Sequence, residues 1–145
     1  MAGSYVVRND DKQRAFPKGK SVMRCACATY DYAVHGGAVG AKKLGVTIPK
    51  GAIIWESLID VDTTCTTASA DAGTMAISVA SANDIVSAIA VSDASNPWDS
   101  GKHAGVPVGS AATCIELTAD CVVTATIAVQ AFTAGKFRVW LFYFL

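Results

Sequence analysis

The side chains most able to carry chemistry are few and scattered. The two histidines, His35 and His103, each lie in a glycine-containing segment with no second ligand at metal spacing. Asp60 and Asp62 share one face of a predicted strand with Glu56 near them. Calcium takes about six to eight oxygen ligands, so three carboxylates make an incomplete site. We therefore expect a solvated strand face here, and neither a metal nor another cofactor.

No residue pattern points to catalysis. Glu56 and Glu116 could form the carboxylate pair of a glycosidase, but nothing in the sequence selects them. The glycine cluster at residues 36–40 lacks the Gly-Lys-Ser/Thr ending of a phosphate loop, and no Gly-x-Ser-x-Gly nucleophile elbow occurs. The sequence predicts a protein that is not an enzyme.

Five cysteines, an odd number, are spread along the chain: Cys25, Cys27, Cys65, Cys114 and Cys121. The first residues lack the pattern of a secretory signal, so we expect reduced thiols that serve as small core residues. Cys25 and Cys27 are two residues apart, which places them on one side of a strand and matches no common zinc or redox motif. The longest strongly apolar run, residues 139–145, is far shorter than the ~20 residues of a membrane-spanning helix, so no membrane contact is expected.

The charged residues are distributed unevenly along the chain, although its formal net charge is zero. Residues 1–24 have six basic and two acidic side chains (+4), and residues 25–145 have six basic and ten acidic ones (−4). A basic arm on an acidic body predicts contact with a neighbouring subunit or another acidic surface. Nucleic acid is a weaker interpretation, because the arm has no dense Lys/Arg run and few aromatic residues for base stacking. The candidate contact residues of the arm are Arg8, Lys12, Arg14, Lys18 and Lys20.

The last segment, residues 137–145, is apolar on both faces of a predicted strand. Phe137, Val139, Leu141 and Tyr143 point to one side, and Trp140, Phe142 and Phe144 point to the other. Either the strand lies inside a sandwich, or a second protein covers its outer face, because an uncovered strand of this kind is prone to aggregate. We favour the second possibility and predict that all seven residues contribute to a homo-oligomer interface, with a trimer favoured.

The elements that must position these residues are short strands. Period-two patterns and turn residues predict strands over 44–48, 52–62, 74–80, 113–118, 121–130 and 137–145, with a possible strand over 21–32 and a possible short helix over 83–91. We expect an all-β fold, an antiparallel β-sandwich or jelly-roll-like barrel with an extended N-terminal arm and at most one short helix. The predicted division is an arm and lead-in strand over 1–43 and the sandwich domain over 44–145.

The connection over residues 93–109 is long enough to form a binding or assembly surface. Trp98 within it is the best candidate for an exposed aromatic residue. It could anchor a partner, stack on a sugar, or cover the end of the sandwich. Packing or partner contact is favoured over sugar binding, because no converging polar residues surround Trp98 in the sequence.

Several segments resemble small structural proteins of tailed bacteriophages. Residues 44–54 are similar to their opening strand, residues 75–79 with 81–85 to their next strand and the stretch after it, and residues 124–129 with 132–137 to their closing hairpin. The resemblance implies a β-sandwich virion protein, such as a capsid decoration (cement) protein, a head fibre or a tail component.

Together these patterns predict a non-enzymatic structural protein of a phage virion, assembled in the bacterial cytoplasm. It would form a homo-oligomer that decorates or cements the capsid, and its basic arm would contact the major capsid protein or another virion protein. The alternative is a tail or fibre module that binds a receptor or glycan through Trp98.

Overall fold

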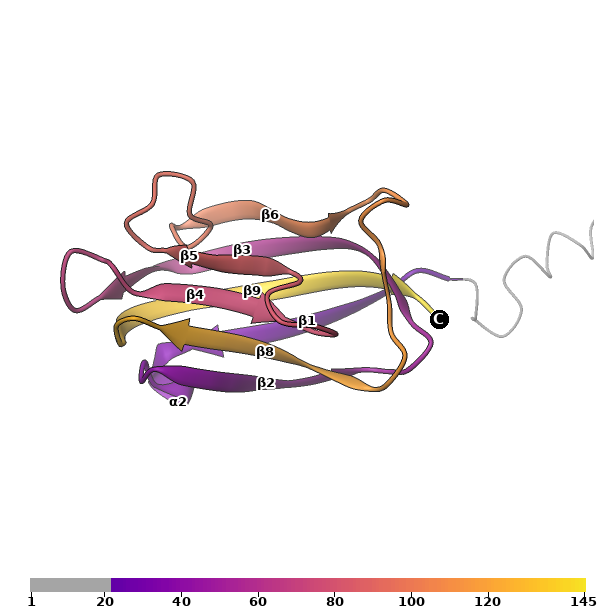
Figure 1. Ribbon diagram of the computed structural model, residues 1–145, viewed down its shortest axis with the longest axis horizontal. Coiled ribbons are helices and arrows are strands. Elements are labelled where there is room, and N and C mark those ends of the chain that lie inside the picture. Colours follow the sequence, from indigo (N-terminus) through magenta and orange to yellow (C-terminus); the bar gives the residue numbers. More distant parts are fainter. Residues whose placement is uncertain (1–21) are drawn as a thin grey trace, which may run out of the picture.

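The computed structural model describes residues 22–145, which form a two-layer β-sandwich (Figure 1). In chain order the elements are β1 (Arg24–Asp31), α2 (Tyr32–His35), β2 (Gly40–Ile48), β3 (Ile53–Thr67), β4 (Thr74–Ser78), β5 (Val86–Ala90), β6 (Gly101–Val108), β7 (Ile115–Glu116), β8 (Cys121–Ala128) and β9 (Phe132–Phe144). The first sheet has the order β1-β9-β3-β6 with β7 paired to β3, and the second has the order β2-β8-β4-β5. All strand pairs in this part of the chain are antiparallel. The predicted all-β sandwich is confirmed; these strands form two sheets and no closed barrel.

Alternation of side chains builds the core between the sheets. On β8, Val123, Ala125 and Ile127 are fully buried, while Thr124 and Thr126 face outward. On β9, Phe137, Val139 and Leu141 are also fully buried. The Phe137 ring packs between Tyr30 and Trp98, with ring centroids 5.2 and 5.3 Å away. The C-terminal strand therefore supplies the centre of the first sheet and much of the core.

A bulge in β3 changes which residues face inward. The pairing of β3 with β9 shifts between Ile54 and Glu56. As a result Ile54 is fully buried and Ile53 is 38% exposed. An uninterrupted period of two would instead place Ile53 on the inner face with Ile59 and Val61, which are buried beyond the bulge. An extra residue in one strand inverts the facing of everything before it, which a period-two pattern cannot anticipate.

Two segments differ from their predicted secondary structure. Residues 83–91 include strand β5 and no helix, because Asp84 closes a turn by accepting hydrogen bonds from the backbone N–H groups of residues 79–81, after which the chain pairs with β4. The predicted long loop over 93–109 contains β6, which pairs with β3. The predicted division between residues 43 and 44 falls within β2, and β1 is a full member of the first sheet.

The connection between β1 and β2 depends on close backbone contact. Asp31 caps the single turn α2 by accepting a hydrogen bond from the N–H of Ala33. At Gly37 an added Cβ would overlap the carbonyl oxygen of Phe132 and crowd the Tyr32 ring. The N–H of Phe132 also donates to the Gly37 carbonyl at 2.8 Å. Only glycine fits at position 37, so this glycine in the β1–β2 connection is required by packing.

Trp98 is buried, and the prediction of an exposed aromatic residue is wrong. Its ring has no exposed area and packs at a tilt of 43° on Phe137. Its backbone N–H donates to Oδ1 of Asn96 at 2.7 Å, and its carbonyl accepts from Cys65 at 2.9 Å. The loop folds over the end of the sandwich, so Trp98 covers the core, which was the third of the interpretations that the sequence left open.

Replacing the central ring of this core tests the arrangement. Phe137→Ala should lower the free energy of unfolding by about 3–5 kcal/mol, because it removes a fully buried ring from between two others. The measurement is urea denaturation followed by tryptophan fluorescence. The control Leu145→Ala truncates a side chain that is 41% exposed on the same C-terminal segment, and it should cost less than about 1 kcal/mol. Equal losses in the two variants would contradict the assigned core.

Candidate interaction surface

The groups that could do chemistry have structural partners. Nδ1 of His35 lies 3.1–3.2 Å from the backbone N and O of Asp31 and its ring stacks on Tyr30, and Nε2 of His103 lies 2.7 Å from the carbonyl oxygen of Asp99. Among residues 22–145 no cluster of three or more His, Cys, Asp or Glu side chains could hold a metal ion. The same residues include no helix long and apolar enough to cross a bilayer.

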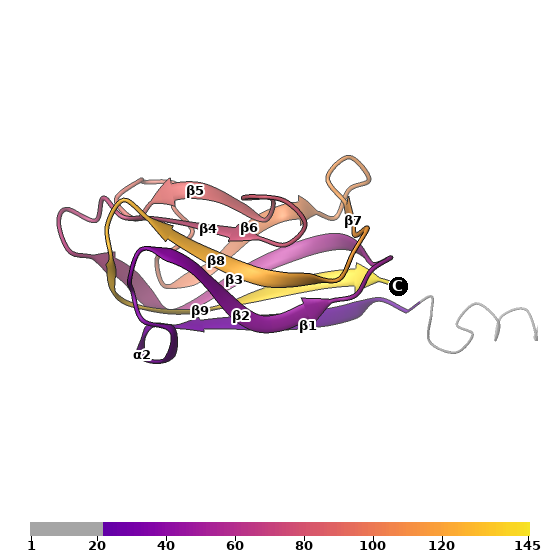
Figure 2. The ribbon, with the colours of Figure 1, turned by 60° about the horizontal axis from the view of Figure 1, so that its bottom comes forward.

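The outer face of the first sheet has an apolar half, which we call the aromatic face. It consists of Cys25, Cys27, Leu58, Trp140, Phe142 and Phe144. Strand register sets two of its rows: Cys27, Trp140 and Leu58 lie side by side, and in the next row Phe142 lies between Cys25 and the exposed Glu56, which borders the face. Cys25 is exposed and the other five are partly exposed. In Figure 2 no third layer of residues 22–145 covers this side of the sandwich.

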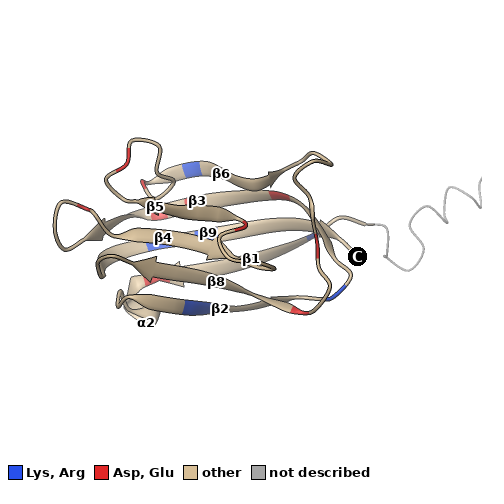
Figure 3. Cartoon of the chain, viewed as in Figure 1, with Lys and Arg blue, Asp and Glu red and all other residues tan. Residues whose placement is uncertain are grey.

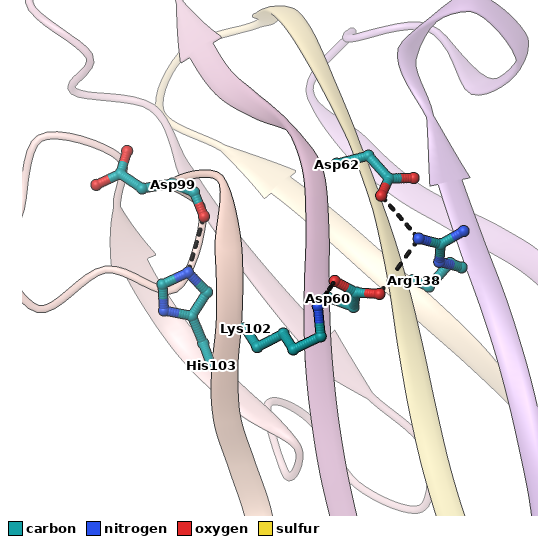
Figure 4. A network of polar contacts seen from close by, with 6 residues as sticks. All are labelled: Asp60, Asp62, Asp99, Lys102, His103 and Arg138. Carbon is teal, nitrogen blue, oxygen red and sulfur yellow. Dashed lines mark hydrogen bonds and ion pairs between the residues drawn. The ribbon is translucent and has the colours of Figure 1, made fainter.

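The other half of this outer face is charged and internally paired (Figure 4). The Arg138 guanidinium donates to Asp60 at 3.2 Å and to Asp62 at 2.7 Å, and Lys102 forms an ion pair with Asp60 at 3.4 Å. We call these four residues the charged belt. Their charges offset one another, with two cations for two carboxylates. The belt is therefore suited to face water, whereas the adjoining aromatic face is suited to contact another molecule.

Three of the five cysteines are not activated for reaction. Partial desolvation against the sheet raises the pKa of the Cys25 and Cys27 thiols, and the Cys27 thiol raises that of Cys25 further. Burial raises the pKa of Cys65 to about 12. Reactive or metal-binding cysteines need a lowered pKa, so these groups act as neutral side chains. The expectation of a core cysteine is correct for Cys65, whereas Cys25 lies exposed at the surface.

The structure separates the predicted interface residues into two groups. Phe137, Val139 and Leu141 are fully buried in the core of the same chain, so their assignment to an oligomer interface is wrong. Tyr143 also packs against the core and is partly exposed. Trp140, Phe142 and Phe144 lie on the aromatic face. The arm residues Arg8, Lys12, Arg14, Lys18 and Lys20 lie outside the described residues.

Sequence reasoning missed the other half of the aromatic face. Cys25, Cys27 and Leu58 belong to strands that are distant from β9 in the sequence, and only the sheet register brings them beside Trp140 and Phe142. The sequence held one indication of these residues: the spacing of Cys25 and Cys27, which predicted that both lie on one side of a strand.

The charged belt predicts a salt-dependent stability. Arg138→Gln leaves Asp60 and Asp62 without their shared cation, so the free energy of unfolding should fall by about 1 kcal/mol at low salt. Urea denaturation should show a smaller loss in about 1 M NaCl, where charges are screened within ~3 Å. The control Lys136→Gln removes one exposed ion pair, with Asp31 at 3.6 Å, and should change stability less. A loss that salt does not alter would contradict an electrostatic origin.

Comparison with known proteins gives matches in fold and none in sequence. No protein-family model matches the chain, and no curated protein matches it. A chain of the cyanophage Pam1 capsid asymmetric unit is 20% identical, with a TM-score of 0.63 over 87% of this chain and 86% of that chain. A chain of the acidic stable capsid of Helicobacter pylori bacteriophage KHP30 is 16% identical, with a TM-score of 0.61 over 87% and 90%. A chain of the capsid of Ralstonia phage GP4 is 16% identical, with a TM-score of 0.60 over 88% and 87%. The sandwich therefore has the fold of chains found in phage capsids.

Proposed function

We propose that this protein is a non-enzymatic structural component of a phage virion, which decorates or cements the capsid as a homo-oligomer. The observation that carries the proposal is the fold, which matches chains of three phage capsids over nearly their whole length. The aromatic face supports it, because a small domain with uncovered aromatic rows gains stability from a partner.

The aromatic face is the part of the described surface best suited to protein contact. Tryptophan and phenylalanine are frequent among residues that dominate binding energy, and here three of them lie in consecutive outward positions on a rigid central strand. Each Å² of apolar surface that a partner buries contributes about 25 cal/mol to the free energy of association. The charged belt beside these rings gives the contact a polar rim.

The alternative of a receptor- or glycan-binding module is weakened by the structure. It depended on Trp98 as an exposed stacking platform, and that ring is fully buried. In Figure 1 the connection between β5 and β6, which includes residue 98, lies beside these two strands at one end of the sandwich. No other observation favours this function.

Trp140 is the residue to change first. Trp140→Ala should weaken binding to virus particles more than tenfold, which corresponds to about 1.4 kcal/mol or more. The measurement is co-sedimentation of purified protein with particles that lack it. The control Thr126→Ala removes an outward side chain from the opposite sheet and should bind normally. Normal decoration by folded Trp140→Ala protein would contradict a contact through the aromatic face.

The basic arm is proposed to bind the shell together with the aromatic face, while the rest of the sandwich supplies the oligomer contacts. Deletion of residues 1–20 removes five basic and two acidic side chains and should abolish particle binding without changing the oligomeric mass. Sedimentation velocity and particle co-sedimentation on the same preparation separate the two effects. If the truncated protein still decorates particles normally, this division of roles is wrong.

A further inference from the structure

The two open edges of the sandwich differ in shape and chemistry. One edge is formed by β1 and β2, and the other by β5 and β6, as the ends of the two strand orders. Between β5 and β6 lies a groove of about 360 Å³. Its apolar lining includes Ile85, Val86, Ile89, Val106 and Val108, and Val106 and Val108 are 44% and 53% exposed. We call this the β5–β6 groove.

Backbone contacts between the sheets hold this groove in place. The N–H of Val106 donates to the carbonyl of Ile85 at 2.9 Å, so β6 is tied to the chain just before β5. Gly105 allows the close approach, because an added Cβ would lie 2.6 Å from Oγ of Ser57 and 3.1 Å from that carbonyl oxygen. The groove is thus a fixed part of the fold, with its outer valines left uncovered among residues 22–145.

Acidic residues lie next to both ends of the groove, although none of them lines it. Asp84 precedes Ile85 at one end, while Asp93 and Asp99 flank Ser95 and Pro97, which line the other end. The Asp93 carboxylate accepts hydrogen bonds from the Ser95 hydroxyl and backbone N–H at 2.7 and 2.8 Å, and these bonds lower its pKa. No basic side chain lines the groove, and Lys102 on the neighbouring face is paired with Asp60.

The opposite edge has the complementary properties (Figure 3). Lys42 and Lys43 lie on β2, and no ion pair engages either of them within residues 22–145. Just before them, the β1–β2 connection presents Val34 and Val39, which are 75% and 57% exposed. We call these four residues the lysine edge. Lys43 is exposed, whereas Lys42 points to the other face of the strand. The exposed valines that precede Lys43 match an apolar groove with acidic residues next to its ends.

We propose that the lysine edge of one copy docks into the β5–β6 groove of the next copy. This inference rests on the proposed homo-oligomer and names its contact. Because the two surfaces differ and lie on opposite edges, the contact is heterologous, and each copy offers one of each to its neighbours. Such contacts close into a ring when the rotation between copies allows, and the predicted trimer is such a ring. The exposed valines are then covered without a further protein.

Two charge changes at exposed positions test this docking. Lys43→Glu places an acid against the acidic residues next to the groove, and Ser87→Lys places a cation inside the groove against the lysine edge. Each variant alone should sediment as a monomer of 15.0 kDa, whereas the wild-type trimer is expected at 45.0 kDa, or three times 15.0 kDa. The double variant Lys43→Glu/Ser87→Lys should regain the wild-type mass, because every contact of the ring then places an acid at position 43 against a cation at position 87. Lys50→Glu, at a turn outside both surfaces, is the matched charge control and should remain oligomeric.

The possible results separate the inference from the proposed function. A monomeric wild-type protein would overturn both the oligomer and this contact. A wild-type oligomer that neither folded variant dissociates would overturn the docking alone. If the arm of residues 1–21 filled the groove instead, arm deletion and Ser87→Lys would change the mass alike while Lys43→Glu left it unchanged, which also overturns the proposal. Recovery of the oligomer in the double variant, after its loss in each single variant, supports the proposal, since loss of folding in either single variant could not produce that recovery.

Discussion

The molecule is organised around β9, a strand whose side chains are apolar on both faces. Strand β9 lies between β1 and β3, and this position buries one of its two apolar faces. Phe137, Val139 and Leu141 enter the core with no exposed area. The same pleat must then send Trp140 and Phe142 to the outer side. Among residues 22–145 no third layer covers that side. The fold thereby creates a surface that another chain can bury, and the proposed virion role depends on that constraint.

The sequence predicted this strand well because its information is local. Alternation alone separated Phe137, Val139 and Leu141 from Trp140, Phe142 and Phe144, and the structure places these two sets on opposite sides of the sheet. It could not say which set faces a partner, because that depends on which strands flank β9. Pairing with β1 joins residues more than a hundred positions apart, and no local pattern specifies such a pairing.

The errors have physical causes of the same kind. Trp98 lies in a segment rich in Gly, Pro and Asn, which predicts an exposed loop, yet the loop folds back and its indole completes the ring cluster around Phe137. β6 was missed because Gly101, Gly105 and Pro107 are unusual strand residues; at an edge, Gly105 instead permits close contact with the second sheet. The bulge in β3 turned Ile54 inward and Ile53 outward, which a regular alternation would not do. Each outcome depends on tertiary contact that overrides a local preference.

The central claim is that another chain covers the aromatic face in the assembled protein, and Cys25 is a natural reporter of it. This thiol is exposed in the single chain and lies beside Phe142. The most direct measurement is its alkylation rate by iodoacetamide, read by peptide mass spectrometry, in virus particles and in the folded protein at a dilution where it is monomeric. Coverage predicts that Cys25 reacts at least tenfold more slowly in particles. Equal rates in intact particles and in the folded monomer would contradict the account.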